Sequence, residues 1–404
     1  MQLLAAETLV LGGRVVGPGW LLFDEIIYEI GEGSPPAPVR DAASVVTTLP
    51  GGVLCPGLVD IQVNGAFGVD FASATDDEWV RVAQQMPSTG VTAFVPTFIT
   101  APIEELAENL DAYGALRPLL DATPGAARTL GVHLEGPFLA ERRRGAHRAE
   151  LLCDPDPAMI TRLLDAAGGG LTYMTLAPER AGALEAIGQL TAAGVRVALG
   201  HCDADAPTVR AAADAGASLV THLYNAQRPM RHRDPGTVGA ALTDPRLTCG
   251  LIVDLHHVSP IAVEIAFRAS AGAIALVSDA VAAMGMPAGT YELGGDRLDV
   301  QPGLPPRRAD GAIAGSALRM DEAVANAVLR CGVDLRSAIN SATQIPAYAV
   351  GRSDLGLIAP EAPADLTWLG EDLLARTTWV GGQIAWSAER ERASSARAAV
   401  TSPR

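Results

Sequence analysis

The middle of the chain alternates short apolar runs with longer segments rich in alanine, leucine and glutamate. Eight of the runs have the continuous apolar character of strands that are buried on both faces, and they are residues 57–62, 90–97, 129–135, 171–177, 195–201, 217–222, 248–254 and 273–279. The helix-like segments between them include 102–119, 157–167, 181–193, 207–215 and 259–271. Eight parallel strands alternating with helices are the number needed to close a barrel. The pattern therefore predicts an α/β fold built on a (β/α)8 barrel of the TIM type.

A doubly wound open sheet would also alternate strands with helices. In the dinucleotide-binding version of that fold, a Gly-x-Gly-x-x-Gly turn opens the helix after the first strand. No such turn follows residues 57–62. This absence favours the barrel over the open sheet.

The two ends of the chain carry a different pattern. Short runs rich in valine, leucine and isoleucine, interrupted by glycine and proline, occupy residues 8–32 and 43–54. This composition predicts antiparallel strands. Similar runs return at residues 364–370 and 377–386. We therefore expect the two ends to form one small β-sandwich-like domain together.

These patterns divide the chain into four parts. The small β domain is expected at residues 1–54 and 346–387, and the barrel at residues 55–345. Residues 388–404 contain too little apolar material to pack, which predicts a disordered tail.

Charge and cysteine content narrow the partners and the compartment. The 404 residues carry a formal net charge of −16, so nucleic acid is not an expected partner. The five cysteines form no Cys-x-x-Cys pair, which indicates reduced thiols. The first residues lack the basic start of a signal peptide, and no uncharged apolar stretch of about 18 residues predicts a membrane span. We therefore expect no membrane partner and a cytoplasmic location.

The carboxyl ends of the strands are where a parallel barrel places its functional side chains. Glu135, His201 and His222 stand at the ends of the third, fifth and sixth predicted strands. One carboxylate and two imidazoles can hold a zinc-like ion and leave a position for water. Asp279, at the end of the eighth strand, is placed to accept a proton from that water. His133 lies two residues before Glu135 and faces the same side, so it is either a further ligand or a supporting residue.

Two amides end the first predicted strand, in the run Val-Asp-Ile-Gln-Val-Asn-Gly. Gln62 and Asn64 point to one side of a strand, where a pair of histidines would suggest a second metal ion. Neutral amides bind zinc-like ions weakly, and the chain has no lysine that could be carboxylated to bridge two ions. We therefore expect one ion per chain, and we expect the amides to hydrogen-bond water or substrate hydroxyls.

Three other charged sites have weaker signals. Asp60 and Asp254 also lie near strand ends, where they either hydrogen-bond locally or support the site. The run Glu-Arg-Arg-Arg at residues 141–144 is expected to be a solvated loop.

Several short segments, in order and at suitable spacing, resemble one enzyme family. They read PGLVDIQVNG, GVTAFVPTFIT, GVHLEGPFL, RGAH, LAPE, GHCDAD, THLYNAQ, HRDPG, HHV, VSDA and AGSAL. From about residue 50 to 325 the chain is similar to the N-acetylglucosamine-6-phosphate deacetylases of the amidohydrolase superfamily. The resemblance implies metal-dependent hydrolysis of the N-acetyl group of N-acetylglucosamine 6-phosphate, giving glucosamine 6-phosphate and acetate in amino-sugar metabolism.

The resemblance also implies roles for single residues. It makes Asp279 the general acid and base, and Glu135, His201 and His222 the ligands of one divalent ion, with zinc expected and iron, cobalt or manganese as alternatives. It implies that His147 helps to polarise the acetyl carbonyl.

The phosphorylated end of the amino sugar has its own implied set of residues. The resemblance assigns the sugar phosphate to Asn225, Ala226, Arg233 and His257. It further implies that the chain forms a homodimer, with His257 reaching in from the partner subunit.

Alternatives to this reaction stay open. The chain departs from the family pattern at Cys202, Asp205 and Gln227, so the same deacetylation of galactosamine 6-phosphate or of a biosynthetic amino sugar is the first alternative. Hydrolysis of a cyclic amide or a dipeptide is disfavoured, because relatives with those activities commonly carry His-x-His after strand one. A non-catalytic scaffold is the last alternative, and its signal would be the loss of a ligand or of Asp279.

Overall fold

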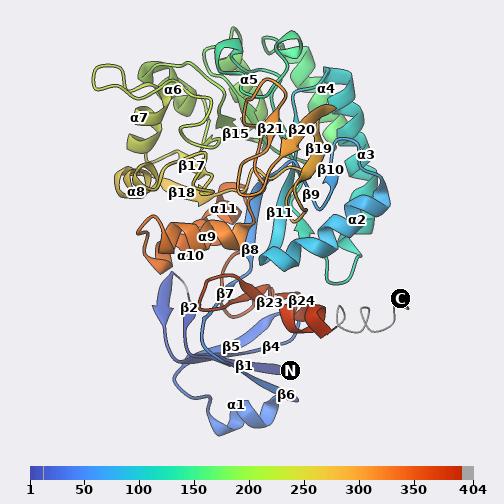
Figure 1. Cartoon of the computed structure of the whole chain (residues 1–404), viewed down its shortest axis with the longest axis vertical. Helices are drawn as coiled ribbons and strands as arrows, with labels where there is room; N and C mark the ends of the chain where they lie inside the picture. Colours follow the sequence, from blue (N-terminus) through green and yellow to red (C-terminus); the bar gives the residue numbers. More distant parts are fainter. Residues whose placement is uncertain (12, 394–404) are drawn as a thin grey trace.

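The structure is a computed structural model that describes residues 1–11 and 13–393. Its centre is a barrel of parallel strands (Figure 1). The barrel strands are β8 (Leu58–Val63), β11 (Val91–Ile99), β13 (Val132–Glu135), β14 (Leu171–Leu176), β15 (Arg196–Leu199), β16 (Leu219–Val220), β17 (Thr248–Leu251) and β18 (Ala273–Leu276). They pair in chain order, and the short strand β12 (Arg128–Thr129) adds to β11. The eight predicted strands and the (β/α)8 architecture are confirmed.

The barrel closes between its first strand and the segment after its last. The amide of Asp279 donates to the carbonyl of Gln62 at 3.0 Å, and the amide of Asn64 donates to the carbonyl of Ala280 at 2.7 Å. These backbone bonds bring the two ends of the sheet together where the predicted functional residues lie.

Helices cover the outside of the barrel (Figure 1). They are α2 (Asp76–Gln85), α3 (Ile103–Asp121), α4 (Pro157–Ala167), α5 (Ala183–Ala192), α6 (Ala206–Asp214), α7 (Gly236–Thr243), α8 (Pro260–Ala269), α9 (Met320–Leu329), α10 (Leu335–Ser341) and α11 (Gln344–Ala349), with the 3-10 turns η1 (Met86–Thr89), η2 (Glu141–Arg143) and η3 (Ala149–Leu151). Within the described residues, no helix is both long enough and apolar enough to span a bilayer.

Helix α4 shows how local sequence sets these boundaries. The side chain of Asp156 accepts a hydrogen bond of 2.8 Å from the amide of Ala158 and so caps the first turn. Gly168 ends the helix in the left-handed region, with φ of 52°. Ile160 and Leu163, three residues apart, are buried on the face toward the barrel.

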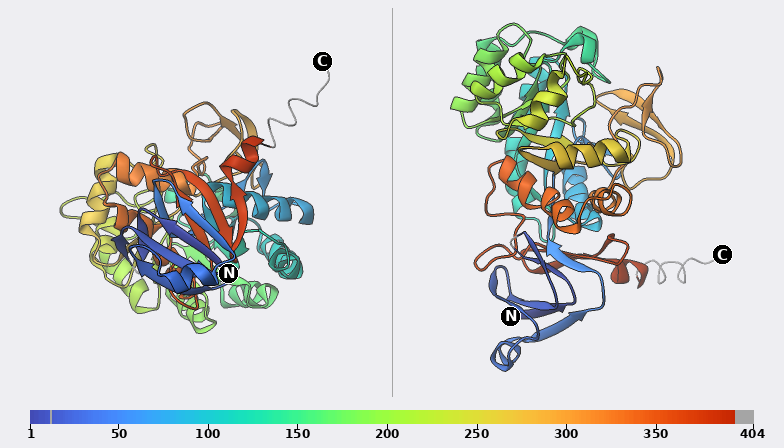
Figure 2. Two further views of the ribbon diagram at one scale, coloured as in Figure 1. Left: turned by 90° about the horizontal axis from the view of Figure 1, so that it is seen from below. Right: turned by 90° about the vertical axis from the view of Figure 1, so that its left-hand side faces the viewer.

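Both ends of the chain build two smaller sheets beside the barrel (Figures 1 and 2). One sheet has the order β5-β4-β1-β6 and the other the order β24-β23-β22-β7-β2-β3. The strands are β1 (Gln2–Ala6), β2 (Leu9–Leu11), β3 (Arg14–Val16), β4 (Gly19–Phe23), β5 (Ile27–Glu32), β6 (Val45–Leu49), β7 (Val53–Pro56), β22 (Leu366–Leu369), β23 (Ala375–Val380) and β24 (Gln383–Ser387), and the short helix α1 (Ala37–Ala42) precedes β6. One apolar cluster joins Leu21 and Phe23 from the first end to Leu366 and Trp379 from the second.

The sequence predicted that the strands of the chain ends would be antiparallel. This prediction is wrong for two pairs of strands. Strand β1 pairs with β6 in parallel, and β2 pairs with β7 in parallel. Apolar runs reveal that a segment is extended, but they do not reveal its partner, which here lies across a long connection. The division at residues 1–54, 55–345 and 346–387 stays a prediction.

The predicted disordered tail begins with ordered residues. Residues 388–393 are helical and directly follow β24. Residues 394–404 of the predicted tail lie outside the described part of the chain.

A small sheet that the sequence analysis did not predict stands beside the mouth of the barrel (Figure 2, right). It consists of the antiparallel strands β19 (Gly289–Leu293), β20 (Asp296–Val300) and β21 (Arg307–Arg308). Gly294 and Gly295 form the turn between β19 and β20, a strong hairpin signal between alternating residues. A shorter hairpin, β9 (Gly65–Ala66) with β10 (Val69–Asp70), follows the first barrel strand.

Candidate active site

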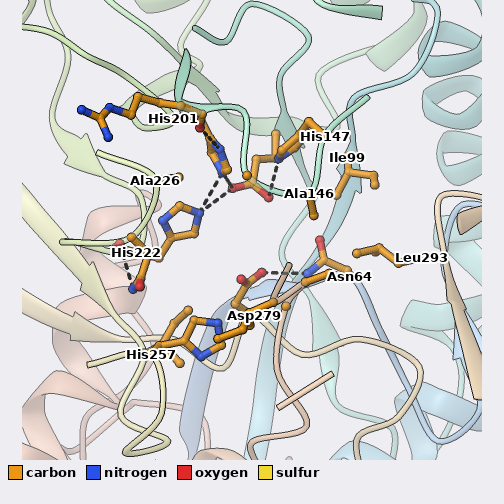
Figure 3. A pocket seen from close by; sticks show the side chains of 18 of the residues that line it. Asn64, Ile99, Ala146, His147, His201, His222, Ala226, His257, Asp279 and Leu293 are labelled. Atoms are coloured by element: carbon orange, nitrogen blue, oxygen red, sulfur yellow. Dashed lines mark hydrogen bonds and ion pairs between the residues drawn. The ribbon is translucent and has the colours of Figure 1, made fainter. Parts of the chain in front are cut away.

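The predicted ligands and the predicted acid/base meet at the carboxyl end of the barrel (Figure 3). Glu135 is the last residue of β13, and the other three follow β15, β16 and β18. His201, His222 and Asp279 have φ angles of 47°, 26° and 50°. Residues other than glycine rarely adopt positive φ, because this backbone conformation costs about 1–3 kcal/mol per residue. They remain in it only where the surrounding structure holds them there. Three of the nine non-glycine residues with positive φ in the described part of the chain therefore lie at these strand ends.

Three lone-pair atoms converge at the centre of this site. Glu135 Oε1 lies 3.2 Å from His201 Nε2 and 3.0 Å from His222 Nε2, and the two Nε2 atoms are 3.0 Å apart. His201 Nδ1 lies 2.9 Å from the carbonyl of Arg143, which assigns its proton to Nδ1 and leaves Nε2 bare. Bare atoms this close need a proton or a cation between them. An ion about 2.0–2.1 Å from each ligand would hold them roughly 3.3 Å apart, so the triangle fits a zinc-like ion.

His147 lies at the edge of this triangle. Its Nδ1 is 2.8 Å from Thr100 Oγ1, and its Nε2 is 3.9 Å from Glu135 Oε2. The ligand atoms of Glu135, His147 and His201 also lie within 4.8 Å of one another, so these three are a second candidate metal set. The shorter distances favour His222 over His147 as the third ligand. Burial lowers the pKa of His147 to about 3, so its imidazole is neutral near pH 7.

Asp279 lies beside the triangle and is held by the two amides of β8. Its Oδ1 accepts hydrogen bonds from Asn64 Nδ2 at 2.8 Å and from Gln62 Nε2 at 3.1 Å. Burial and the nearby charge of Glu135 raise the pKa of Asp279 to about 6. Gln62 Nε2 also lies 3.3 Å from Glu135 Oε1, so one amide spans both carboxylates without adding charge.

The structure separates the two amides that the sequence placed together. Asn64 lines the cavity above the triangle, whereas the described lining residues do not include Gln62. The amide of Gln62 is directed at Glu135 and Asp279 instead. Contact with substrate therefore stays a prediction for Asn64, and Gln62 orients the carboxylates.

We expect Asn64→Ala to move the acid limb of the pH–rate profile to higher pH. Asp279 can accept a proton only when it is ionised, so the rate falls as pH falls through its pKa. The Asn64 hydrogen bond lowers that pKa, and its loss should raise it. The profile of log kcat/KM against pH measures the shift.

Asn326→Ala is the matched control for this change. The Asn326 amide donates to the carbonyl of Val253 at 2.9 Å, away from Asp279. Its acid limb should stay in place. If the acid limb of Asn64→Ala stays in place or moves to lower pH, Asp279 is not the group that titrates in this limb.

His133 lies inside the barrel with both ring nitrogens beside threonine hydroxyls, although it shares a strand with Glu135. Its Nδ1 lies 3.1 Å from Thr97 Oγ1 and its Nε2 lies 2.7 Å from Thr175 Oγ1. Its ring stacks on Tyr173 with centroids 3.8 Å apart. Both nitrogens are therefore engaged inside the barrel, and His133 supports the strand ends from below.

Asp60 and Asp254 also have local partners. Asp60 Oδ1 accepts from the amides of Gln62 and Ser278 at 3.3 and 3.2 Å, and so links the first strand to the end of the last. Asp254 Oδ2 lies 2.7 Å from His257 Nδ1 and holds that ring in place. Both carboxylates are therefore hydrogen-bonded locally.

The residues implied for the sugar phosphate divide into two groups. Asn225, Ala226 and His257 line a cavity of about 360 Å³, a usual size for a small-molecule site. The structure corrects the implied origin of His257, because the His257 of the same chain lines this cavity. Arg233 is exposed and is not among the described lining residues.

Comparison with known sequences identifies the family. Residues 53–385 match the sequence pattern of the amidohydrolase family. The chain belongs to the amidohydrolase family. It is 36% identical to the N-acetylglucosamine-6-phosphate deacetylase of Bos taurus, over 96% of this chain and 94% of the bovine one. It is equally identical, at 36%, to the N-acetylgalactosamine-6-phosphate deacetylase of Escherichia coli O157:H7, over 91% of this chain and 96% of that one.

A solved structure agrees with this amidohydrolase over nearly its whole length. It is a variant N-acetyl-D-glucosamine-6-phosphate deacetylase from Mycobacterium smegmatis in complex with N-acetyl-D-glucosamine-6-phosphate. The TM-score is 0.88 at 37% identity, covering 96% of this chain and 99% of that one.

Two arginines of this amidohydrolase line the cavity although the sequence analysis placed them in a solvated loop. They are Arg142 and Arg143. Arg143 binds Asp203 with 2.6 Å between Nη2 and Oδ1, whereas the side chain of Arg142 is 80% exposed. The available signal was sequence proximity, because the run ends just before His147, which was itself assigned to the site.

Proposed function

We propose that this amidohydrolase hydrolyses the N-acetyl group of N-acetylglucosamine 6-phosphate, giving glucosamine 6-phosphate and acetate in amino-sugar metabolism. One observation carries the proposal: Glu135, His201, His222 and Asp279 converge on a cavity in a chain whose relatives bear the name of this activity.

One divalent ion per chain completes the proposed site. Glu135, His201 and His222 would hold it, with zinc as the first choice and iron, cobalt or manganese as alternatives. Such an ion supplies Lewis acidity, which makes water acidic near neutral pH and polarises a carbonyl group.

Asp279 carries both proton transfers in the proposed reaction. Its carboxylate faces the cavity, and a pKa of about 6 is close to the pH at which a general base works best. It accepts the proton of the attacking water. The protonated carboxyl group then passes that proton to the leaving nitrogen, so the group ends the cycle as it began.

His147 serves the carbonyl oxygen. We propose the tautomer of the neutral ring that carries its proton on Nε2, with Nδ1 2.8 Å from Thr100 Oγ1. His147 lines the cavity, so the Nε2 proton is available to the oxygen that gains negative charge during attack.

Asn225, Ala226 and His257 form the proposed phosphate end. Asn225 Nδ2 lies 3.4 and 3.5 Å from the carbonyls of His222 and Leu223, so its hydrogens are weakly engaged. His257 Nδ1 is bound by Asp254, which leaves Nε2 for the ligand.

The alternative substrate is N-acetylgalactosamine 6-phosphate, which the Escherichia coli relative supports. Acetate release should be measured from N-acetylglucosamine and N-acetylgalactosamine, each with and without the 6-phosphate. The highest kcat/KM is expected for N-acetylglucosamine 6-phosphate. A higher value for the galactosamine isomer selects the alternative, and release from neither sugar contradicts the proposed function.

Metal analysis should give one ion per chain. Gln62 and Asn64 occupy the positions from which a second ion would need ligands, and their amides already bind the carboxylates. Protein saturated with zinc and freed of excess should retain about one equivalent. Two tightly bound equivalents would contradict the single-ion site. The double change Gln62→His with Asn64→His should raise the capacity toward a second ion.

We also propose that the chain acts as a homodimer in the cytoplasm. Ile261 and Ile265 are 70% and 51% exposed and lie four residues apart on α8, so this helix turns apolar side chains outward. The five cysteines are free thiols, as a reducing compartment requires. A measurement of native mass tests the dimer.

A further inference from the structure

The cavity has an apolar wall that the proposed mechanism does not use. Ile99, Ala146, Leu293 and Ala314 all line the cavity. Leu293 and Ala314 belong to one apolar cluster that includes the β19–β20 hairpin, and Ile99 and Ala146 pack against that cluster. These residues, here called the apolar wall, therefore continue the core of the hairpin into the cavity.

The apolar wall and the proposed phosphate end lie on opposite sides of the reacting groups. In Figure 3, Ile99 and Leu293 lie on one side of Asp279, and Ala226 and His257 lie on the other. A ligand held at the phosphate end, with its carbonyl beside Asp279, therefore extends its remaining part toward the wall.

We propose that the apolar wall receives the alkyl part of the acyl group, and that Leu293 sets the longest acyl chain that the enzyme accepts. The inference rests on the proposed function, since it assumes that the sugar phosphate occupies the Asn225 end. A methyl group offers no hydrogen bond, and it is best placed against apolar side chains. Leu293 lies at the end of β19 and lines this side of the cavity.

The turn that directly follows Leu293 is anchored to Asp70 and packs against Ile99. The amide of Gly294 donates to Asp70 Oδ2 at 2.7 Å, and Asp70 Oδ1 accepts from the amide of Ala72 at 3.1 Å. A Cβ added to Gly294 would lie 2.6 Å from Ile99 Cδ1, so the turn packs directly against the barrel. A wall held in this way limits chain length because it does not yield to a longer acyl group.

The test compares N-acetyl, N-propionyl and N-butyryl glucosamine 6-phosphate. In the wild type, each methylene beyond acetyl should lower kcat/KM by about 10- to 200-fold. Leu293→Ala should raise the ratio of kcat/KM for the propionyl substrate to that for the acetyl substrate by at least about tenfold. An unchanged ratio in a folded variant overturns the role of Leu293.

Leu298→Ala is the matched control. Leu298 is buried in the same cluster but is not among the described cavity-lining residues. For Leu298→Ala, the ratio of kcat/KM for the propionyl substrate to that for the acetyl substrate should match the wild type. An equal rise of this ratio in both variants would show that a loosened hairpin, and not the side chain of Leu293, changes the substrate preference.

A second variant covers the case in which Leu293→Ala does not fold. Leu293→Phe should shift preference from N-acetyl toward N-formyl glucosamine 6-phosphate, and no shift overturns the proposal. A wild type that releases no acid from any of these sugar phosphates contradicts the proposed function instead, so the two failures are distinct.

Discussion

Asp279→Asn should lower kcat for acetate release by about 10²–10⁴-fold, the range for a positioned acid/base. Asparagine keeps the shape of the side chain and can still hydrogen-bond, but it neither accepts nor returns a proton. The ligand triangle of Glu135, His201 and His222 is untouched, so the variant should retain its ion. Turnover and metal content, measured on the same preparation, separate the two effects.

Asp254→Asn is the control for this change. Asp254 binds His257 at 2.7 Å and is not among the described residues that line the cavity. Its substitution should act mainly on KM, through the orientation of His257. Turnover near the wild-type level in Asp279→Asn would show that another group moves the proton.

Glu135→Gln should release the ion and abolish activity with it. Loss of an outer partner of a metal ligand already costs about 10- to 100-fold in affinity, and Glu135 is the anionic member of the triangle itself. After dialysis the variant should hold much less than one equivalent of zinc. Its activity should return in part at high zinc concentration.

His133→Asn is the control, because His133 lies two residues before Glu135 and is equally buried. The hydrogen bonds of its imidazole ring to Thr97 and Thr175 should be lost, and this loss should lower the melting temperature. The folded variant should still bind one ion. A folded His133 variant without the ion, or a Glu135→Gln protein that keeps it through dialysis, would contradict the ligand assignment.

The eight barrel strands were predictable because each is an apolar run in a chain that repeats one pattern. Their ends were less so. The predicted strands 195–201, 217–222 and 273–279 included His201, His222 and Asp279 as strand residues. In the structure these residues follow the strands with positive φ, because the site turns each side chain toward a shared centre. Hydrophobic pattern carries no signal for that local strain.

The chemistry of the site was predictable from residue type at the strand ends, but the contacts between side chains were not. The ends of parallel strands share one rim, so one carboxylate and two imidazoles could be brought together in advance. That Gln62 spans Glu135 and Asp279 depends on distances across the closed barrel. The place of Arg143 depends on a loop whose path the residue pattern does not reveal.

The hairpin of β19 and β20 was not predicted, for a different reason. Its residues alternate around Gly294 and Gly295, which is a recognisable pattern. A (β/α)8 barrel needs no such element, so the repeating strand–helix pattern does not predict it. Its contribution to the cavity, through Leu293, became visible only in three dimensions.

The central claim is that the ion held by Glu135, His201 and His222, together with Asp279, removes the acetyl group of N-acetylglucosamine 6-phosphate. The most direct test follows acetate and free amine together, with the wild type before chelation, after removal of the ion and after zinc is restored. The account predicts equal amounts of acetate and amine, loss of both on chelation and recovery of both with about one equivalent of zinc. Undiminished release from protein shown to contain no metal would contradict it.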